Sequence, residues 1–134
     1  MATFLLRILT PEKVLFEQDV EAISVQTEDG ERGFRARHES CMLALPVGCI
    51  RVQYEGKTVT AAISGGVLRI NNVKKVGTLL ANACEWAGDI DVERAKRAEE
   101  NARALLEAKE SHQNLEIAGY QLKRAINRLR VAAK

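Results

Sequence analysis

The spacing of apolar residues changes once along this chain of 134 residues, and that change limits what the chain can fold into. Within residues 4–80, apolar and polar side chains alternate, most clearly at Ile50, Val52 and Tyr54. From residue 90 onward, apolar residues recur at steps of three and four. Alternation is typical of half-buried β-strands, and steps of three and four are typical of amphipathic helices. The sequence therefore predicts a β-rich part followed by a helical part.

The β-rich part consists of short apolar runs separated by residues that favour turns. The runs cover residues 4–9, 14–17, 20–27, 41–45, 49–54, 58–63, 67–70 and 73–80. Turn signals between them include Asp29-Gly30 and Ser64-Gly65-Gly66, the latter too short for a phosphate-binding loop. Many short strands with tight turns favour an antiparallel β-sandwich or flattened barrel of about ten strands. We expect this domain to span residues 1–86.

Residues 87–134 are predicted to form an antiparallel two-helix hairpin with a break near Glu110, which makes the fold class α+β. The apolar faces consist of Ala95, Ala98, Ala102 and Leu105 in the first helix and of Leu115, Ala118, Leu122, Ala125, Leu129 and Ala132 in the second. Asp91 and Ser111 are suited to cap the two N-termini. Alanine lets the helices approach closely but buries little area, so we expect an arm that can leave its packed position.

The composition is that of an ordinary globular protein, with 46% hydrophobic and 28% charged residues. No apolar run approaches the ~18 residues of a membrane span, and the first residues do not resemble a signal peptide. We therefore expect a cytosolic protein. Three cysteines without a C-x-x-C pair are expected to be free. Two histidines without supporting ligands predict no metal site.

Two other classes of function have some support in the sequence. A nucleic-acid-binding β-barrel would use the basic tail beyond Glu116, which contains no acidic residue. However, aromatic residues make up only 4% of the chain, which is too few for base stacking. A cysteine hydrolase would use Cys41 and His38, but a nucleophile and base so close in sequence rarely point at each other. The residues therefore predict neither an active site nor a nucleic-acid partner.

Six segments carry a family resemblance through their order and spacing. They are residues 6–12 (LRILTPE), 20–25 (VEAISV), 29–34 (DGERGF) followed by His38, 63–70 (ISGGVLRI), 90–95 (IDVERA) and 129–132 (LRVA). Together they resemble the epsilon subunits of bacterial F-type ATP synthases, whose mitochondrial equivalent is called delta. The resemblance extends over nearly the whole chain.

This resemblance implies a non-catalytic rotor subunit of the central stalk, at the cytoplasmic face of the bacterial plasma membrane. Its β domain would bind the gamma subunit and rest on the ring of c subunits, so that rotation driven by an ion gradient reaches the catalytic head. The helical arm would extend toward the catalytic alpha and beta subunits and inhibit ATP hydrolysis. No cofactor is required, and ATP is implied as a regulatory ligand.

The resemblance also implies two partner contacts. In the family, the segment around the histidine lies at the end of the β domain that faces the c-ring, which assigns this contact to Glu31, Arg35, Arg37 and His38. The chain departs from the family pattern here, because Arg35-Ala36-Arg37 replaces the usual apolar residue, proline and glycine. The second contact joins the basic tail to an acidic surface of the catalytic subunits. It is assigned to Lys123, Arg124, Arg128 and Arg130.

Some bacterial members of the family bind ATP on the folded arm, and this chain carries the corresponding residues. The motif is present as Ile90-Asp91-Val92-Glu93-Arg94-Ala95. The resemblance implies an ATP site made of Glu85, Ile90, Asp91, Arg94, Arg124 and Arg128. Guanidinium groups suit phosphate oxygens, and a carboxylate can accept from the adenine amino group or a ribose hydroxyl. The alternative is that Asp91 only caps the helix and the arginines face solvent.

Overall fold

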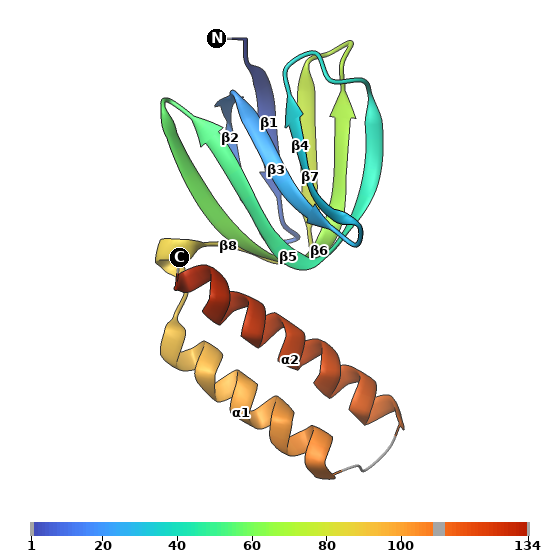
Figure 1. Cartoon of the computed structure of the whole chain (residues 1–134), viewed down its shortest axis with the longest axis vertical. Helices are drawn as coiled ribbons and strands as arrows, with labels where there is room; N and C mark the ends of the chain where they lie inside the picture. Colours follow the sequence, from blue (N-terminus) through green and yellow to red (C-terminus); the bar gives the residue numbers. More distant parts are fainter. Residues whose placement is uncertain (1, 109–111, 134) are drawn as a thin grey trace. The chain divides into compact units, whose positions relative to one another are not determined.

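The computed structural model describes residues 2–108 and 112–133, which belong to two compact units, Met1–Trp86 and Ala87–Lys134 (Figure 1). The first unit is built from strands and the second from helices, so the predicted α+β fold class is confirmed. None of the helices in the described residues is both long enough and apolar enough to cross a lipid bilayer.

In the described part of the first unit, eight strands form one sheet that folds over a common core. The strands run in the order β2-β1-β7-β6-β5-β3-β4, and β8 pairs with β6. Their bounds are β1 (Phe4–Leu9), β2 (Val14–Val20), β3 (Ala22–Thr27), β4 (Gly30–Arg35), β5 (Cys41–Tyr54), β6 (Lys57–Asn71), β7 (Val76–Ala81) and β8 (Cys84–Trp86).

The prediction of about ten short strands is wrong in its details, because two long strands each absorb a pair of predicted runs. β5 continues through Pro46, and β6 continues through the predicted turn at Ser64-Gly65-Gly66. Gly65 has φ of +92°, which bends β6 without ending it. A Cβ added to Gly66 would lie 2.4 Å from the carbonyl oxygen of Leu80. Gly65 and Gly66 therefore allow β6 to bend and to approach β7 closely, and they do not form a hairpin turn.

The prediction also missed two strands and one strand direction. β4 buries only Phe34 among its six residues, and β8 has only three residues, so neither gives an alternating signal. β1 pairs with β7 in parallel, with Leu5 opposite Val76 and Leu9 opposite Leu80. The sheet is therefore mixed and not purely antiparallel. A parallel pair joins segments far apart in sequence, and local periodicity carries no information about it.

The core of the β unit is formed by the inward-facing residues of the alternating strands. Fully buried members include Leu6, Ile8, Ile23, Val25, Ile50, Val52, Leu68 and Leu79. Phe16 joins this core to two further rings, packing edge-on against Tyr54 at 5.2 Å and Trp86 at 5.6 Å between ring centroids. Burial of these side chains is the main stabilising contribution to the unit.

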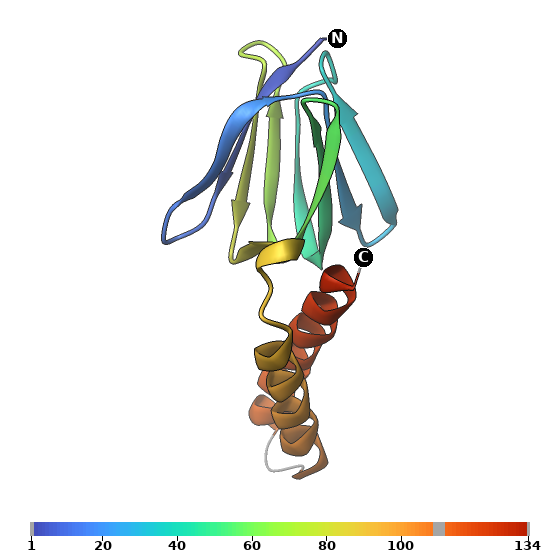
Figure 2. The ribbon, with the colours of Figure 1, turned by 90° about the vertical axis from the view of Figure 1, so that its left-hand side faces the viewer.

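The second unit consists of a short 3-10 helix, η1 (Ala87–Asp89), and the helices α1 (Val92–Ala108) and α2 (His112–Ala132). Figure 1 shows α1 and α2 side by side, and Figure 2 shows the same pair turned by 90° about the vertical axis. Asp91 caps α1 as predicted, because its Oδ1 atom accepts a hydrogen bond from the backbone N–H of Arg94 at 3.1 Å. The predicted break at Glu110 and the predicted cap Ser111 lie outside the described residues.

The two helices pack through the predicted alanines. Ala95, Ala102, Ala118 and Ala125 are all between 0% and 2% exposed. The inclusion of Leu105 in this face is wrong, since its side chain is 46% exposed and the neighbouring Leu106 is half-buried instead. A step of four from Ala102 keeps Leu106 on the packed face, whereas a step of three turns Leu105 toward solvent.

Candidate functional site

A cavity of about 310 Å³ lies between the two helices of the second unit. It is lined by Arg94, Ala98, Asn101, Gln121, Arg124, Ala125 and Arg128. Three of these side chains are guanidinium groups and two are neutral amides, and none of the described residues that line the cavity is acidic. The cavity is therefore suited to an anion that also offers hydrogen-bonding groups to amides.

Helical periodicity brings these side chains together. Arg94 and Asn101 stand seven residues apart on α1, and Arg124 and Arg128 stand four apart on α2, so each pair shares one helical face. The small side chains of Ala98 and Ala125 leave the space that the arginines border. The Nε atom of Arg128 is buried, and the guanidinium of Arg124 lies 5.8 Å from the ring centroid of Tyr120.

Three of the six residues assigned to an ATP site, Arg94, Arg124 and Arg128, line this one cavity. The other three assigned residues are not among those that line the cavity. Asp91 caps α1, Ile90 is 8% exposed, and Glu85 lies in β8 of the first unit with its backbone paired to Ala62. ATP binding by this set stays a prediction.

Sequence reasoning missed two residues of the cavity, Asn101 and Gln121. A signal for them existed, because Asn101 follows Arg94 by two helical turns and Gln121 precedes Arg124 by one. Both were overlooked since a neutral amide on a polar helix face carries no charge pattern.

The basic tail divides into two groups in the folded hairpin. Lys123 and Arg130 are exposed, whereas Arg124 and Arg128 are partly buried and line the cavity. Arg130 donates to the Oδ1 atom of Asn127 at 2.8 Å, and Asn127 is only 4% exposed. The four residues assigned to contact the catalytic subunits therefore do not form one exposed surface in this packed form.

The segment assigned to the c-ring contact is partly a strand and not wholly a loop. Glu31 and Arg35 lie in β4, where the carboxylate of Glu31 accepts from Arg51 and from the hydroxyl of Ser24. Arg37 follows the strand with φ of +71°. The ring of His38 packs edge-on against Phe34 at 4.7 Å between centroids. The sequence placed these side chains in one segment, but it gave no sign of the ion pair with Arg51.

A row of apolar side chains crosses the outer face of the β unit and was not predicted as a surface. Strand pairing places Leu9 opposite Leu80, Leu80 opposite Val67, and Val67 opposite Ala44. Leu80 is 53% exposed, although its neighbour Leu79 is fully buried. Val14 extends the row onto β2 through its pairing with Leu9. Leu80 and Val14 are large exposed apolar side chains of this row, which makes the row a candidate contact surface.

Comparison with known families covers almost the whole chain. Residues 3–87 match "ATP synthase, Delta/Epsilon chain, beta-sandwich domain", and residues 89–133 match "ATP synthase, Delta/Epsilon chain, long alpha-helix domain". The chain belongs to the ATP synthase delta/epsilon chain family. Members of this family are non-catalytic subunits, as the sequence resemblance implied. The nucleic-acid-binding and hydrolase interpretations lose their support as a result.

Relatives in this family match the chain over nearly its full length. The "ATP synthase epsilon chain" of Caldicellulosiruptor bescii is 41% identical over 132 residues, covering 98% of this chain and 95% of the relative. The protein of the same name from Ruminococcus albus is 38% identical over 134 residues, covering 100% of this chain and 99% of the relative. Both support the assignment to the family's bacterial epsilon chains.

Two solved structures have a similar fold. One chain comes from the Euglena gracilis mitochondrial ATP synthase, described as "OSCP/F1/c-ring in rotational state 1". It has a TM-score of 0.84 and 26% identity, and the match covers 100% of this chain and 83% of that chain. A chain of the Tetrahymena thermophila mitochondrial ATP synthase, "central stalk/cring", has a TM-score of 0.67 at 11% identity. The match covers 96% of this chain and 95% of that one, and it shows the fold alone.

The cysteines of this family member are free, as predicted. Burial, together with the smaller effect of the neighbouring charge of Glu85, raises the pKa of the Cys84 thiol to about 12. A thiol with such a pKa is a poor nucleophile at neutral pH.

Among the described residues, no group of histidine, cysteine and carboxylate side chains is arranged to hold a metal ion.

Proposed function

We propose that the chain is a central-stalk subunit of a bacterial ATP synthase whose helical arm responds to ATP. Its β unit would join the gamma subunit to the c-ring at the cytoplasmic face of the plasma membrane. Its arm would inhibit ATP hydrolysis when it extends toward the catalytic subunits. Family membership and the printed descriptions of the Euglena and Tetrahymena assemblies support the stalk part of this proposal.

The apolar row on the β unit supports docking onto the gamma subunit. Leu80, Leu9 and Val67 present side chains on the outer face of the sheet, where the unit's own core cannot use them. Burying apolar area against a partner contributes about 25 cal/mol per Å² before the cost of association. The next row contains Arg7, Thr78 and Arg69, which supply polar groups to the rim of such an interface.

The c-ring contact is proposed for the other assigned group, Glu31, Arg35, Arg37 and His38. Arg35 and Arg37 are exposed, so both guanidinium groups are available to a partner. Glu31 is held by Arg51 and Ser24, which gives the carboxylate a fixed place on the surface. A fixed charge loses less conformational entropy on binding than a mobile one.

The convergence of Arg94, Arg124 and Arg128 on one cavity carries the regulatory part of the proposal. ATP bears several negative charges on its phosphates, and the three guanidinium groups come from both helices. Bound ATP would therefore bridge α1 and α2 and hold the hairpin together. Its stabilisation follows from mass action and reaches about 2.7 kcal/mol at a hundredfold excess over Kd.

Arg124 and Arg128 have two proposed roles, and the packed hairpin makes these roles alternatives. In the packed form both side chains border the cavity, where they are placed to contact ATP. In an extended arm the same side chains would be free to meet an acidic surface on the catalytic subunits. ATP would therefore compete with the inhibitory contact for the same arginines. Bound ATP would favour the packed arm over the extended, inhibitory arm.

The test is isothermal titration of ATP into the full chain, with Arg94→Ala compared against Arg97→Ala. Both residues are exposed arginines of α1, but only Arg94 borders the cavity. We expect saturable binding that Arg94→Ala weakens at least tenfold and Arg97→Ala leaves unchanged, because a charge-assisted contact contributes about 1.5–3 kcal/mol. The fluorescence of Trp86, the last residue of the β unit, gives a second readout.

Two outcomes would count against ATP control. Absence of both heat and a Trp86 response would remove ATP as a ligand, and equal loss in the two variants would remove the cavity as its site. The stalk role would stand in either case, because it rests on family membership and on the β unit.

A further inference from the structure

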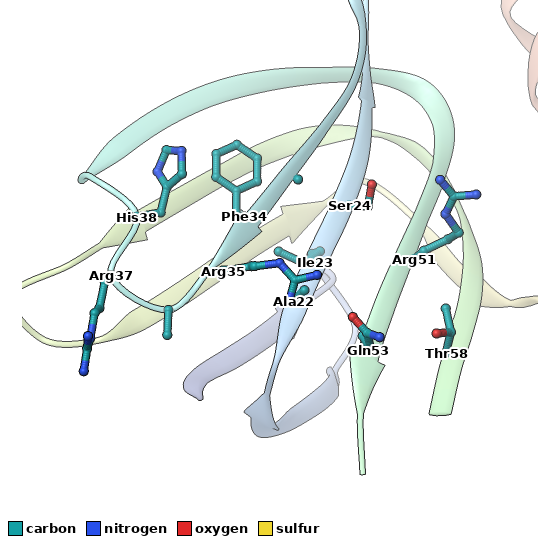
Figure 3. A pocket seen from close by; sticks show the side chains of 12 residues that line it. Ala22, Ile23, Ser24, Phe34, Arg35, Arg37, His38, Arg51, Gln53 and Thr58 are labelled. Atoms are coloured by element: carbon teal, nitrogen blue, oxygen red, sulfur yellow. The ribbon is translucent and has the colours of Figure 1, made fainter. Parts of the chain in front are cut away.

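The outer face of β3, β4 and β5 contains a hollow of about 540 Å³, which extends from the segment of Arg35, Arg37 and His38 across to Arg51 and Thr58 (Figure 3). Its polar rim is formed by Ser24, Arg35, Arg51, Gln53 and Thr58. The hollow lies wholly within the β unit, so its geometry does not depend on the helical arm.

Strand register explains why the sheet is hollowed at this point. Ala22 of β3 stands opposite Arg35 on one side and Gln53 on the other, and Ser24 stands opposite Gly33. Side chains on one face of neighbouring strands stand in rows. Ala22 and Gly33 contribute almost no side chain to these rows, so the longer side chains around them form walls above a low floor.

The two walls carry arginines that can reach one ligand. Figure 3 shows Arg35 extending from β4 over Ala22 toward β5, the strand that carries Arg51 and Gln53. Neighbouring strands lie about 4.8 Å apart, and two residues along a strand span about 6.8 Å. The Cα atoms of Arg35 and Arg51 are therefore about 12 Å apart, a distance that two extended arginine side chains can close around a small anion.

The charge around the hollow is positive. Arg35, Arg37 and Arg51 line it, and among the described residues no aspartate or glutamate does so. Glu31, on the same strand as Arg35, accepts a hydrogen bond from Arg51. A guanidinium has five N–H donors, so this bond orients Arg51 and leaves donors for a second anion.

We propose that this hollow binds a phosphate group between Arg35 and Arg51, with Gln53 and Thr58 as further hydrogen-bond donors. A phosphate has the charge for two guanidinium groups and enough acceptor oxygens for the neutral donors. The hollow is larger than a phosphate ion, which favours a phosphate ester. The ester can be a soluble molecule or the headgroup of a phospholipid, and the chemistry of recognition is the same.

The test is nuclear magnetic resonance of the labelled full chain, titrated with inorganic phosphate at constant ionic strength in chloride. We expect saturable shifts at the amides of Ser24 and Gly33 and at the Nε–H groups of Arg35 and Arg51. Arg35→Gln should weaken binding at least tenfold, because it removes one of the two charged walls. Arg69→Gln is the matched control, since Arg69 is an exposed arginine of β6 that does not border the hollow.

Two further arms distinguish the sources of the phosphate. Glycerol phosphate represents a soluble ester, and vesicles of phosphatidylglycerol, compared with phosphatidylcholine, represent a membrane headgroup. Binding in either arm that depends on Arg35 supports the proposal and identifies the source. Absence of saturable shifts with phosphate, ester and vesicles would overturn it, as would equal affinities for Arg35→Gln and Arg69→Gln. Signals from the β unit report this site separately from any ATP bound to the arm.

Discussion

Replacing Ala102 with leucine tests whether the arm is held by the close approach of α1 and α2. Ala102 is 0% exposed and belongs to the packed face of α1, together with Ala95. Leucine adds three carbon atoms at a position that is already fully enclosed. Overpacking of this kind typically costs about 1–3 kcal/mol, because neighbouring side chains and the helix axis must shift.

The consequence can be expressed as a population. A cost of about 2 kcal/mol lowers the ratio of packed to separated helices about 30-fold, since 1.4 kcal/mol corresponds to a factor of ten. The packed face is mostly alanine, so the free energy that holds the two helices together is small. If ATP binds only the packed form, its apparent affinity falls by up to the same factor.

The assay is denaturant unfolding followed by the helical circular dichroism signal, with resonances of the β unit recorded in parallel. Ala104→Leu is the control, because Ala104 is exposed on the same helix and undergoes the same chemical change. We expect a lower helix midpoint for Ala102→Leu only, and unchanged β-unit resonances in both variants. Equal midpoints for the two variants would refute tight packing at Ala102.

Two further predictions concern the β unit. Leu80→Glu should weaken binding to isolated gamma subunit at least tenfold in calorimetry, because it places a charge in the apolar row. Val73→Glu is the control and should leave binding unchanged, because Val73 is 91% exposed and lies outside the row. Equal effects of the two variants would argue against this face as the gamma contact. For Cys84, the folded state retains the thiol proton up to a pKa of about 12, whereas the unfolded thiol ionises near 9.0. Stability from this group is therefore complete below pH 9.0 and is lost toward pH 12 by up to about 1.4 kcal/mol per pH unit. Cys84→Ala should remove that part of the pH dependence in denaturant unfolding, and identical profiles would contradict it.

Much of the helical unit could be predicted from the sequence because helical contacts are local. The cap at Asp91 follows from one residue and the helix that comes after it. The alignment of Arg124 with Arg128 follows from a step of four. The error at Leu105 arose because steps of three and four fit the pattern equally well, and only the partner helix selected Leu106.

The β unit was predictable as a class and less so in its connections. Alternation identified inward-facing residues of β5, such as Ile50 and Val52. It could not reveal that β6 passes through Ser64-Gly65-Gly66 without a turn, because that depends on how β7 approaches Gly66. Strand pairing joins residues that are distant in sequence, and the periodicity within one segment does not show which strands pair.

The sequence alone determined the two-part organisation, the helix cap and the family, since each depends on local spacing or on the order of short segments. Only the tertiary structure decided which surfaces exist. The apolar row around Leu80 and the hollow between Arg35 and Arg51 each draw on strands that are separated along the chain. Their side chains become neighbours through sheet register, which is fixed by burial of the whole core and not by any one segment.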